Sequence, residues 1–366
     1  MSNRQTARRS KLIQLIRKSG VGALLVTNPR NVTYLTGFTG EDSWLLIGAS
    51  QLQLFSDSRF ETQLKDECPE VPAEIRTSRT LLPDFLASLL PKFGLTRLGI
   101  ESSSMTVGVR DLLAEKLKPV EVVSQPGMVE ELRMIKDSDE IRELRQAVHQ
   151  AQRGFELMKS QLVLEQTERE AAHELEHGMR RFGALRAAFD PIIAVGDRAA
   201  LPHYRAGLRQ FSMAGFALVD WGAVSPGGYH SDLTRLLATS KLPPKLYNVY
   251  GVVLRAQQAG IAAIRPGARC QDVDAAARKV IEESGFGKYF GHGLGHGIGL
   301  DIHEGPRLSP ISTDELKPGM VVTVEPGIYL PGVGGVRIED DILVTRDGHE
   351  VLSSLPRQEP FAVDNG

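Results

Sequence analysis

The stretch AGFALVDWGAVSPGGYHSDLTRLLA, residues 214–238, contains two apolar runs separated by a loop rich in glycine and proline. The first run ends at Asp220, and the second begins directly after Asp232. Short apolar runs bounded by turn residues are typical of strands. The stretch therefore predicts a β-hairpin with one carboxylate beside the loop on each arm.

A similar arrangement occurs further along the chain. Glu325 ends the run VVTVE (321–325), Glu339 ends the run GVRIE (335–339) after the turn PGVGG, and another strand is expected at DILVT (341–345). Each segment thus places two carboxylates at matching positions on a hairpin. A single acid after a strand is usually a solvated loop residue, but four in two equivalent hairpins indicate a shared purpose.

Two predicted helices precede each hairpin. Those of the first half begin near residues 138 and 168, and those of the second half span about 244–264 and 271–284. The capping boxes of the first pair are Asp137 with Glu140 and Thr167 with Glu170. The repeated order predicts a duplicated α+β unit, in which a mixed, mostly antiparallel sheet carries its helices on one face.

A smaller α/β domain is expected before this unit. Its predicted strands are ALLVT (23–27), WLLIG (44–48) and RLGIES (97–102), and helices are expected within SKLIQLIRKS (10–19) and LLPDFLASLLPKFG (81–94). The connecting segment SQPGMVEELRMIKDSDE follows. We therefore expect two domains, residues 1–130 and 131–366.

Composition narrows the class of protein. The 366 residues are 42% apolar and 24% charged, and their net charge of -2 favours neither nucleic acid nor an anionic membrane as a partner. No apolar run approaches the roughly 20 residues that span a bilayer. Cys68 and Cys270 suggest two buried thiols in the reducing cytosol, so we expect a cytoplasmic protein. The basic N-terminus also fits a transit peptide, but a surface helix ending at Gly20 is the preferred interpretation.

The glycine-rich stretch GHGLGHGIGLDIHE (291–304) supplies three histidines, His292, His296 and His303. So many glycines exclude a stable helix, and the spacing matches neither a P-loop nor a dinucleotide-binding motif. Glycine instead lets the strand backbone and an imidazole approach a crowded centre. Four carboxylates and one histidine would be neutralised by two divalent cations. Such ligands favour Mn²⁺ or Co²⁺, with Zn²⁺ as an alternative.

Several motifs together resemble those of the dinuclear pita-bread metallopeptidases, which include methionine aminopeptidase, aminopeptidase P and prolidase. They are VDWG…SDLTR, GHGLGHGIGLDIHE, TVEPGIY and GVRIEDD, within residues 135–358. The resemblance implies that Asp220 chelates one metal ion and that Asp232 and Glu339 bridge both. It also implies that His296 and Glu325 complete the second metal site.

The same resemblance assigns residues around the substrate. His203, in ALPHY, and His303 are expected to contact the substrate or relay a proton, and His292 is expected to line the cleft. Arg337 is expected to support a bridging carboxylate, with a simple charge partner as the alternative. Arg307 is a candidate for binding a substrate carboxylate, although an exposed loop arginine is equally common.

The predicted N-terminal domain favours one branch of the family. NVTYLTGFTG (31–40) and SDSRFETQ (56–63) are similar to the creatinase-like N-terminal domain of aminopeptidase P and prolidase. Creatinase itself lacks the metal ligands. The resemblance therefore implies an Xaa-Pro aminopeptidase or dipeptidase whose substrate has proline at its second position, and often a homodimer. The interval from Asp220 to Asp232 is one residue longer than is common in the family.

The expected reaction is hydrolysis by a hydroxide that bridges two metal ions, because divalent cations lower the pKa of bound water. Glu325 is the expected general base, and His203 and His303 are expected to stabilise the oxyanion. Two other functions remain open at this point. One is a catalytically inactive binding protein with the same fold, and the other is a creatinase-like C–N hydrolase that needs no metal.

Overall fold

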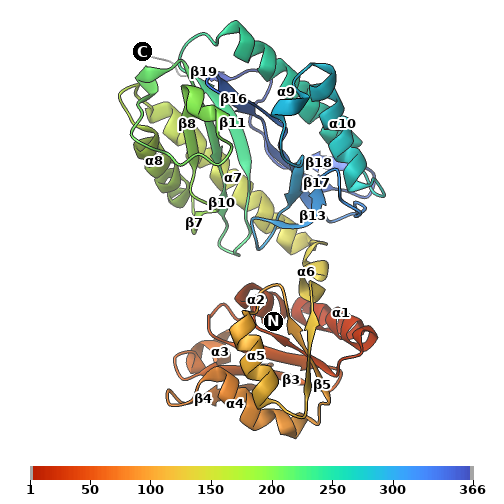
Figure 1. Ribbon diagram of the computed structural model, residues 1–366. Coiled ribbons are helices and arrows are strands. Elements are labelled where there is room, and N and C mark those ends of the chain that lie inside the picture. Colours follow the sequence, from red (N-terminus) through yellow and green to blue (C-terminus); the bar gives the residue numbers. More distant parts are fainter. Residues whose placement is uncertain (1–2, 363–366) are drawn as a thin grey trace. The chain divides into compact units, whose positions relative to one another are not determined.

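The computed structural model describes residues 3–362 (Figure 1). These residues divide into two compact units, of which the N-terminal unit ends at Arg133 and the C-terminal unit begins at Met134. Within the described residues, no helix is long and apolar enough to cross a membrane.

The N-terminal unit is built on a six-stranded mixed sheet in the order β4-β3-β2-β1-β5-β6. Its strands are β1 (Ala23–Val26), β2 (Trp44–Gly48), β3 (Leu52–Asp57), β4 (Ala73–Arg76), β5 (Arg97–Glu101) and β6 (Glu121–Gln125). Its helices are α1 (Asn3–Ser19), α2 (Pro29–Thr36), α3 (Glu61–Glu67), α4 (Leu82–Leu89), α5 (Val107–Lys116) and α6 (Met128–Arg133), with a 3₁₀ turn η1 (Leu90–Phe93). The three strands and two helices expected from the sequence are present within this α/β arrangement.

The C-terminal unit repeats one order of elements, as predicted. Its first half contains α7 (Ser138–Gln161), α8 (Glu168–Arg181), β7 (Arg186–Ala187), β8 (Ile192–Val195), the 3₁₀ turns η2 (Gly196–Ala200) and η3 (Phe211–Met213), β9 (Phe216–Trp221), β10 (Ala223–Val224) and β11 (Leu233–Ala238). Its second half contains α9 (Pro244–Ala263), α10 (Cys270–Glu283), η4 (Gly287–Tyr289), β12 (Gly295–Gly297), β13 (Glu304–Leu308), β14 (Val321–Val324), β15 (Gly327–Leu330), β16 (Gly334–Arg337), β17 (Asp340–Val344), β18 (His349–Val351) and β19 (Phe361–Ala362).

Local sequence decides where the helices of the first half begin. Asp137 Oδ1 accepts hydrogen bonds from the N–H groups of Asp139 and Glu140, and the Glu140 carboxylate accepts one from the N–H of Asp137. Thr167 and Glu170 form the same reciprocal pair at the start of α8. Both predicted capping boxes are confirmed, because each satisfies N–H groups that a helix leaves unpaired in its first turn.

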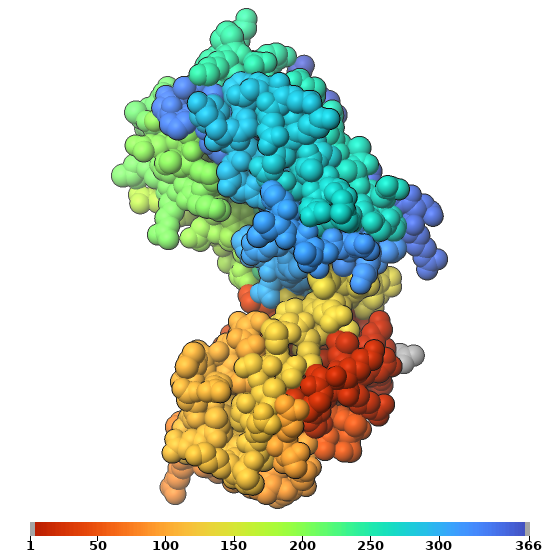
Figure 2. All heavy atoms as spheres, turned by 45° about the vertical axis from the view of Figure 1, so that its right-hand side comes forward, coloured from red at the N-terminus to blue at the C-terminus, as the bar shows by residue number. Residues whose placement is uncertain are grey.

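The strands of the C-terminal unit form two main sheets, in the orders β19-β11-β9-β8 and β13-β12-β14-β17-β18. All neighbouring strands are antiparallel except β11 and β19. An isolated bridge between Thr234 and Glu339 joins the two sheets. Figure 1 shows α7 and α8 beside the first sheet and α9 and α10 beside the second, and α10 faces the viewer in Figure 2. The predicted pita-bread fold is confirmed.

The second hairpin differs from its prediction. Strand β14, which precedes Glu325, pairs with β17 rather than with the strand that leads to Glu339. The residues between them form a separate two-stranded arm, β15 and β16, around the turn at Gly332. The expected pairing was therefore wrong in its strand partner, because the sequence showed three apolar runs but not which two of them pair.

Candidate metal centre

Two acids of the first sheet lie on one face, because side chains alternate between the two faces of a strand. Ala217 and Val219 of β9 pack with α7 and α8, whereas Phe216 and Leu218 face the second half of the unit. Because strand side chains alternate between faces, Asp220 lies on the same face as Leu218. Its register partner on β11 is Thr234. Asp232, two residues before Thr234, is brought to that same face.

On β14 and β16 and directly after them, the side chains that face the site have odd residue numbers, whereas Asp220 and Asp232 have even ones. Val322 and Val324 of β14 belong to the core that includes α9 and α10, so Thr323 and Glu325 point the other way. At the end of β16 and directly after it, the core residues are Val336 and Ile338, and Arg337 and Glu339 alternate with them. The two sheets therefore direct their carboxylates toward a common centre from opposite sides.

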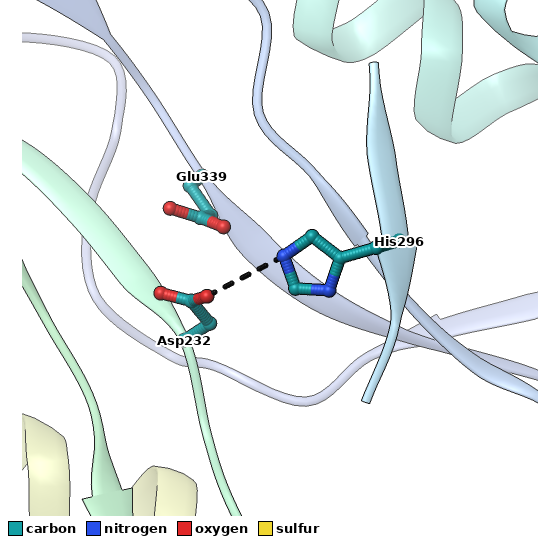
Figure 3. A group of neighbouring side chains, drawn as sticks. All are labelled: Asp232, His296 and Glu339. Atoms are coloured by element: carbon teal, nitrogen blue, oxygen red, sulfur yellow. Dashed lines mark ion pairs between the residues drawn. The ribbon is translucent and has the colours of Figure 1, made fainter. Parts of the chain in front are cut away.

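Asp232, His296 and Glu339 meet at this centre (Figure 3). Each offers one ligand atom, and the three atoms lie within 4.8 Å of one another. His296 Nε2 is 3.6 Å from Asp232 Oδ2 and 3.4 Å from Glu325 Oε1. Four of the five predicted metal ligands thus surround one point, and they come from β11, β12, β14 and β17 or the residues beside these strands.

The tautomer of His296 is set by its own strand. Its Nδ1 lies 3.0 Å from the carbonyl oxygen of Gly297, so that nitrogen carries the proton and donates it. Burial lowers the pKa of His296 to about 4, which keeps the ring neutral near pH 7. The Nε2 lone pair consequently faces the carboxylates, the orientation that a metal-binding histidine requires.

Several carboxylate oxygens at this centre are left without a partner. The buried oxygens Asp220 Oδ1, Asp232 Oδ1 and Glu339 Oε1 have no hydrogen-bond partner. Burial raises the pKa of Asp232 and Glu339 well above the usual range, and neighbouring acids raise both further. Burial also raises the pKa of Glu325 to about 7. Unpaired buried carboxylates are costly, and divalent cations would satisfy these oxygens.

Arg337 connects the two halves. Its Nη2 forms an ion pair with Asp220 Oδ2, its Nη1 donates to the Tyr329 hydroxyl at 2.7 Å, and its Nε donates to Thr234 Oγ1 at 3.1 Å. The Thr234 hydroxyl in turn donates to Glu339 Oε2 at 2.5 Å. Arg337 therefore orients Asp220 directly and Glu339 through Thr234.

A cavity of about 820 Å³ opens onto this centre. It is lined by the ten residues that the sequence predicts for the site: His203, Asp220, Asp232, His292, His296, His303, Arg307, Glu325, Arg337 and Glu339. The cavity lies within the C-terminal unit, and apolar side chains such as Phe290 and Ile311 also line it. A peptide-sized ligand could therefore contact the centre.

Two independent matches cover nearly the whole chain. Residues 142–346 match the model of metallopeptidase family M24, and residues 8–135 match the creatinase/prolidase N-terminal domain. The chain belongs to metallopeptidase family M24. Among M24 relatives, the Xaa-Pro dipeptidase of Pyrococcus horikoshii is 34% identical over 349 residues, which cover 95% of this chain and 97% of that protein.

Solved structures agree with this membership. An Xaa-Pro dipeptidase from Bacillus anthracis superposes with a TM-score of 0.92 at 38% identity, covering 98% of this chain and 99% of that one. An X-Pro aminopeptidase from Thermotoga maritima MSB8 gives a TM-score of 0.87 at 32% identity, with 97% and 100% covered. Both N-terminal and C-terminal units are therefore shared with these structures.

The histidines around the M24 cavity have different surroundings. His292 Nε2 lies 3.0 Å from the Tyr329 hydroxyl, and burial lowers the pKa of His292 to about 4. The His303 ring packs edge-on against that of His296, with centroids 4.4 Å apart, and burial lowers its pKa as well. His203 and Arg307 are exposed at the cavity. His292 is thus held by Tyr329, whereas His203 and Arg307 reach solvent.

Four residues of this centre were missed at the sequence level. Thr234 and Thr323 contact Glu339 and Glu325, Tyr329 contacts Arg337, and the Asp341 carboxylate accepts a hydrogen bond from the N–H of Asp232. Both threonines stand two residues from an expected ligand. A search for polar residues at that spacing would have found them, because alternate residues of a strand share a face.

Buried Arg235 connects the backbone segments that carry the residues of the centre. The Arg235 guanidinium donates to the main-chain carbonyl oxygens of Thr234 (2.9 Å) and Glu339 (2.6 Å) and pairs with Asp340 at 2.7 Å. It also donates to the carbonyl oxygens of Leu355 and Pro356. The strands that carry Asp232 and Glu339 are thereby fixed to each other and to the chain after β18.

Proposed function

We propose that this protein is a metal-dependent exopeptidase that hydrolyses the peptide bond before proline, in dipeptides or at peptide N-termini. The observation that carries the proposal is the meeting of the neutral His296 Nε2 with unpaired carboxylate oxygens at the end of a peptide-sized cavity. The names of the Pyrococcus, Bacillus and Thermotoga relatives support Xaa-Pro bonds as the substrate class.

The residues fit two divalent cations. Asp220, Asp232, His296, Glu325 and Glu339 would hold them. The donors are mostly hard oxygens, which supports Mn²⁺, with Co²⁺ or Zn²⁺ as alternatives. Metal content and activity after reconstitution with each ion measure this preference.

When bound, the ions would activate a water molecule and polarise the scissile carbonyl. Glu325 is the proton carrier in this scheme. Its carboxylate lies beside His296 in the cavity, where it can take a proton from the attacking water. It then delivers that proton to the proline nitrogen, which must be protonated to leave as an amine. The Thr323 hydroxyl, 3.2 Å from Glu325 Oε1, orients the carboxylate.

The cavity histidines and Arg307 would position the substrate. His303, whose pKa is lowered by partial burial, and His203 would donate hydrogen bonds to the carbonyl oxygen as negative charge develops on it. Exposed Arg307 would bind the C-terminal carboxylate of a dipeptide. Its place on the cavity wall supports a dipeptidase, and aminopeptidase activity is the alternative.

The decisive experiment compares Xaa-Pro dipeptides with longer Xaa-Pro-Xaa peptides after Mn²⁺ loading. Cleavage of either class, lost on chelation and restored by metal, supports the proposal, and the ratio of the two distinguishes dipeptidase from aminopeptidase. If the fully loaded protein cleaves neither class, the peptidase proposal fails. Activity that survives chelation would instead indicate creatinase-like hydrolysis.

We also propose that the protein acts in the cytoplasm as a homodimer. Its two cysteines are free and buried, which suits a reducing compartment. The family resemblance supports the dimer. Light scattering of the purified protein tests it, since a 40.1 kDa chain gives a clearly different mass for one copy and for two.

A further inference from the structure

Glu168, the first residue of α8, is a fully buried acid that the mechanism above does not use. Its Oε1 accepts a hydrogen bond from the N–H of Val195 at 2.8 Å. Its Oε2 accepts one from the Tyr204 hydroxyl at 2.8 Å and one from the N–H of Gly207 at 2.9 Å. A buried carboxylate is tolerated only when donors satisfy it, and these three donors do so.

The three donors lie within or directly beside one segment, residues 196–206. Val195 precedes the segment, Gly207 follows it, and Tyr204 is the neighbour of His203 in sequence. Two backbone hydrogen bonds hold the same end of the segment, from Glu168 N to Arg209 O and from Arg169 N to Gly207 O. Hydrogen bonds to the first residues of α8 therefore fix the chain both before and after His203.

The chain is also closely packed at Gly207. A Cβ atom there would lie 3.1 Å from the Tyr204 hydroxyl and 3.3 Å from Glu168 Oε2, closer than most real contacts. The segment itself contains the short 3₁₀ turn η2 and then irregular chain, and it places Pro202 and His203 on the cavity wall. Irregular chain keeps a side chain in place only when other groups hold it.

We propose that Glu168 is a positioning residue for His203, because it fixes the ends of the 196–206 segment and so places the imidazole at the substrate. The inference rests on the proposed function only where it assigns His203 to the substrate. The fixing of the segment by Glu168 is independent of any reaction.

Glu168→Gln is the sharpest test. The amide has the same shape, but its NH₂ group must replace either Oε1 or Oε2. It then faces the N–H of Val195 or the N–H of Gly207, so two donors oppose each other in a buried site. Tyr204→Phe is a milder second variant, since it removes one hydrogen bond and its side chain does not line the cavity.

Glu170→Gln is the matched control. Glu170 lies on the same turn of α8, but it is exposed and serves only the capping box with Thr167. Both variants remove one negative charge from the first turn of α8, so an effect of that charge on the helix would appear in both. An effect confined to Glu168→Gln and Tyr204→Phe comes from the 196–206 segment.

The first measurement is hydrogen exchange of the metal-loaded protein. We expect faster amide exchange in peptides covering residues 196–210 for Glu168→Gln and Tyr204→Phe than for wild type and Glu170→Gln. Exchange that is equal in all four proteins would overturn the proposal. This readout remains decisive even if wild type cleaves no Xaa-Pro substrate, which would count against the proposed function alone.

The second measurement is a double-mutant cycle on kcat for an Xaa-Pro dipeptide. Misplacement of His203 should lower kcat about 10- to 100-fold in Glu168→Gln. In a His203→Ala background, the same change should lower kcat less than about twofold, because the group that Glu168 positions is already gone. Equal losses in both backgrounds would mean a merely structural role. If Glu168→Gln does not fold, Tyr204→Phe takes its place in the cycle.

Discussion

The two halves of the C-terminal unit repeat one plan but contribute different chemistry. In the first half, β9 and β11 are direct neighbours, and their loop ends carry only acids, Asp220 and Asp232. In the second half, the β15–β16 arm is inserted between the paired strands β14 and β17. That arm supplies Tyr329 and Arg337. The repeated hairpins thus provide matched carboxylates. The inserted arm provides the guanidinium of Arg337, which orients them.

The contacts between the halves show why neither half suffices. Arg337 from the second half pairs with Asp220 from the first, and Thr234 from the first half donates to Glu339 from the second. The second half also supplies the neutral imidazole of His296, which lies on β12. The centre is therefore an interface between two repeats, and substitutions on each side test how unequal their contributions are.

Removing a shared carboxylate should have the largest effect. Asp232→Asn leaves the side-chain shape but abolishes the charge that we propose to hold the ions. We expect kcat/KM to fall about 1,000-fold or more, because several kcal/mol of metal-derived stabilisation are lost. Kinetics and metal analysis measure this, with exposed Asp314→Asn as the control. Full metal content in Asp232→Asn would contradict the ligand assignment.

Arg337→Lys tests the inserted arm. Lysine keeps the charge but has no planar fork, so it cannot contact Asp220, Thr234 and Tyr329 together. We expect kcat/KM to fall about 10- to 100-fold, and metal affinity to fall as well. The exposed substitution Arg346→Lys should change neither. An unchanged Arg337→Lys enzyme would mean that charge alone, not orientation, is what the arm contributes.

Thr234→Val tests the reverse contribution, from the first half to the second. Valine has nearly the same shape but lacks the hydroxyl that joins Arg337 to Glu339. We expect metal affinity to fall about tenfold, measured by titration calorimetry. Exposed Thr313→Val should bind metal as wild type does. A loss as large as that of Asp232→Asn would place Thr234 among the ligands themselves.

The last test concerns folding stability rather than activity or metal affinity, and it uses the pH dependence of the metal-free protein. Because burial raises the pKa of Glu325 from its usual 4.5 to about 7, its protonated form is favoured by folding. Its stabilising contribution is complete below pH 4.5 and is lost as the pH rises through 7, at about 1.4 kcal/mol per pH unit in that window.

Denaturant unfolding of wild type and Glu325→Gln at a series of pH values measures this difference. Relative to Glu325→Gln, wild type should lose stability between about pH 4.5 and 7. Added Mn²⁺ should reverse the trend, since ions bind the ionised carboxylate. If the stability curves of the two metal-free proteins run parallel, ionisation of Glu325 does not destabilise the folded protein, and the prediction is wrong.

The sequence predicted best what neighbouring residues decide. The capping boxes at Asp137 and Thr167 depend on side chains three residues apart, and both are present. Asp220 and Asp232 were correctly placed beside their loop, because an apolar run and a turn locate them without reference to distant residues. The ligand motifs were recognisable for the same reason.

Long-range pairing was the part that the sequence could not supply. The apolar runs at β14, β16 and β17 look alike, so nothing local shows that β14 pairs with β17 and leaves β16 to the arm. The ion pair of Arg337 with Asp220 joins residues 117 positions apart. In the N-terminal unit, β4 is only four residues long and partly exposed, so it has no clear apolar pattern.

The division of the ligands between two repeats also sets an order of events during synthesis. Glu339 follows Thr234 by 105 residues, so at about 5–20 residues per second a ribosome needs roughly 5–20 seconds to make the intervening chain. During that interval Asp220 and Asp232 exist without Arg337 or Glu339. A nascent chain therefore cannot form the proposed cation site until its second repeat has emerged and folded. Any ion that the site binds would be taken up only after that point.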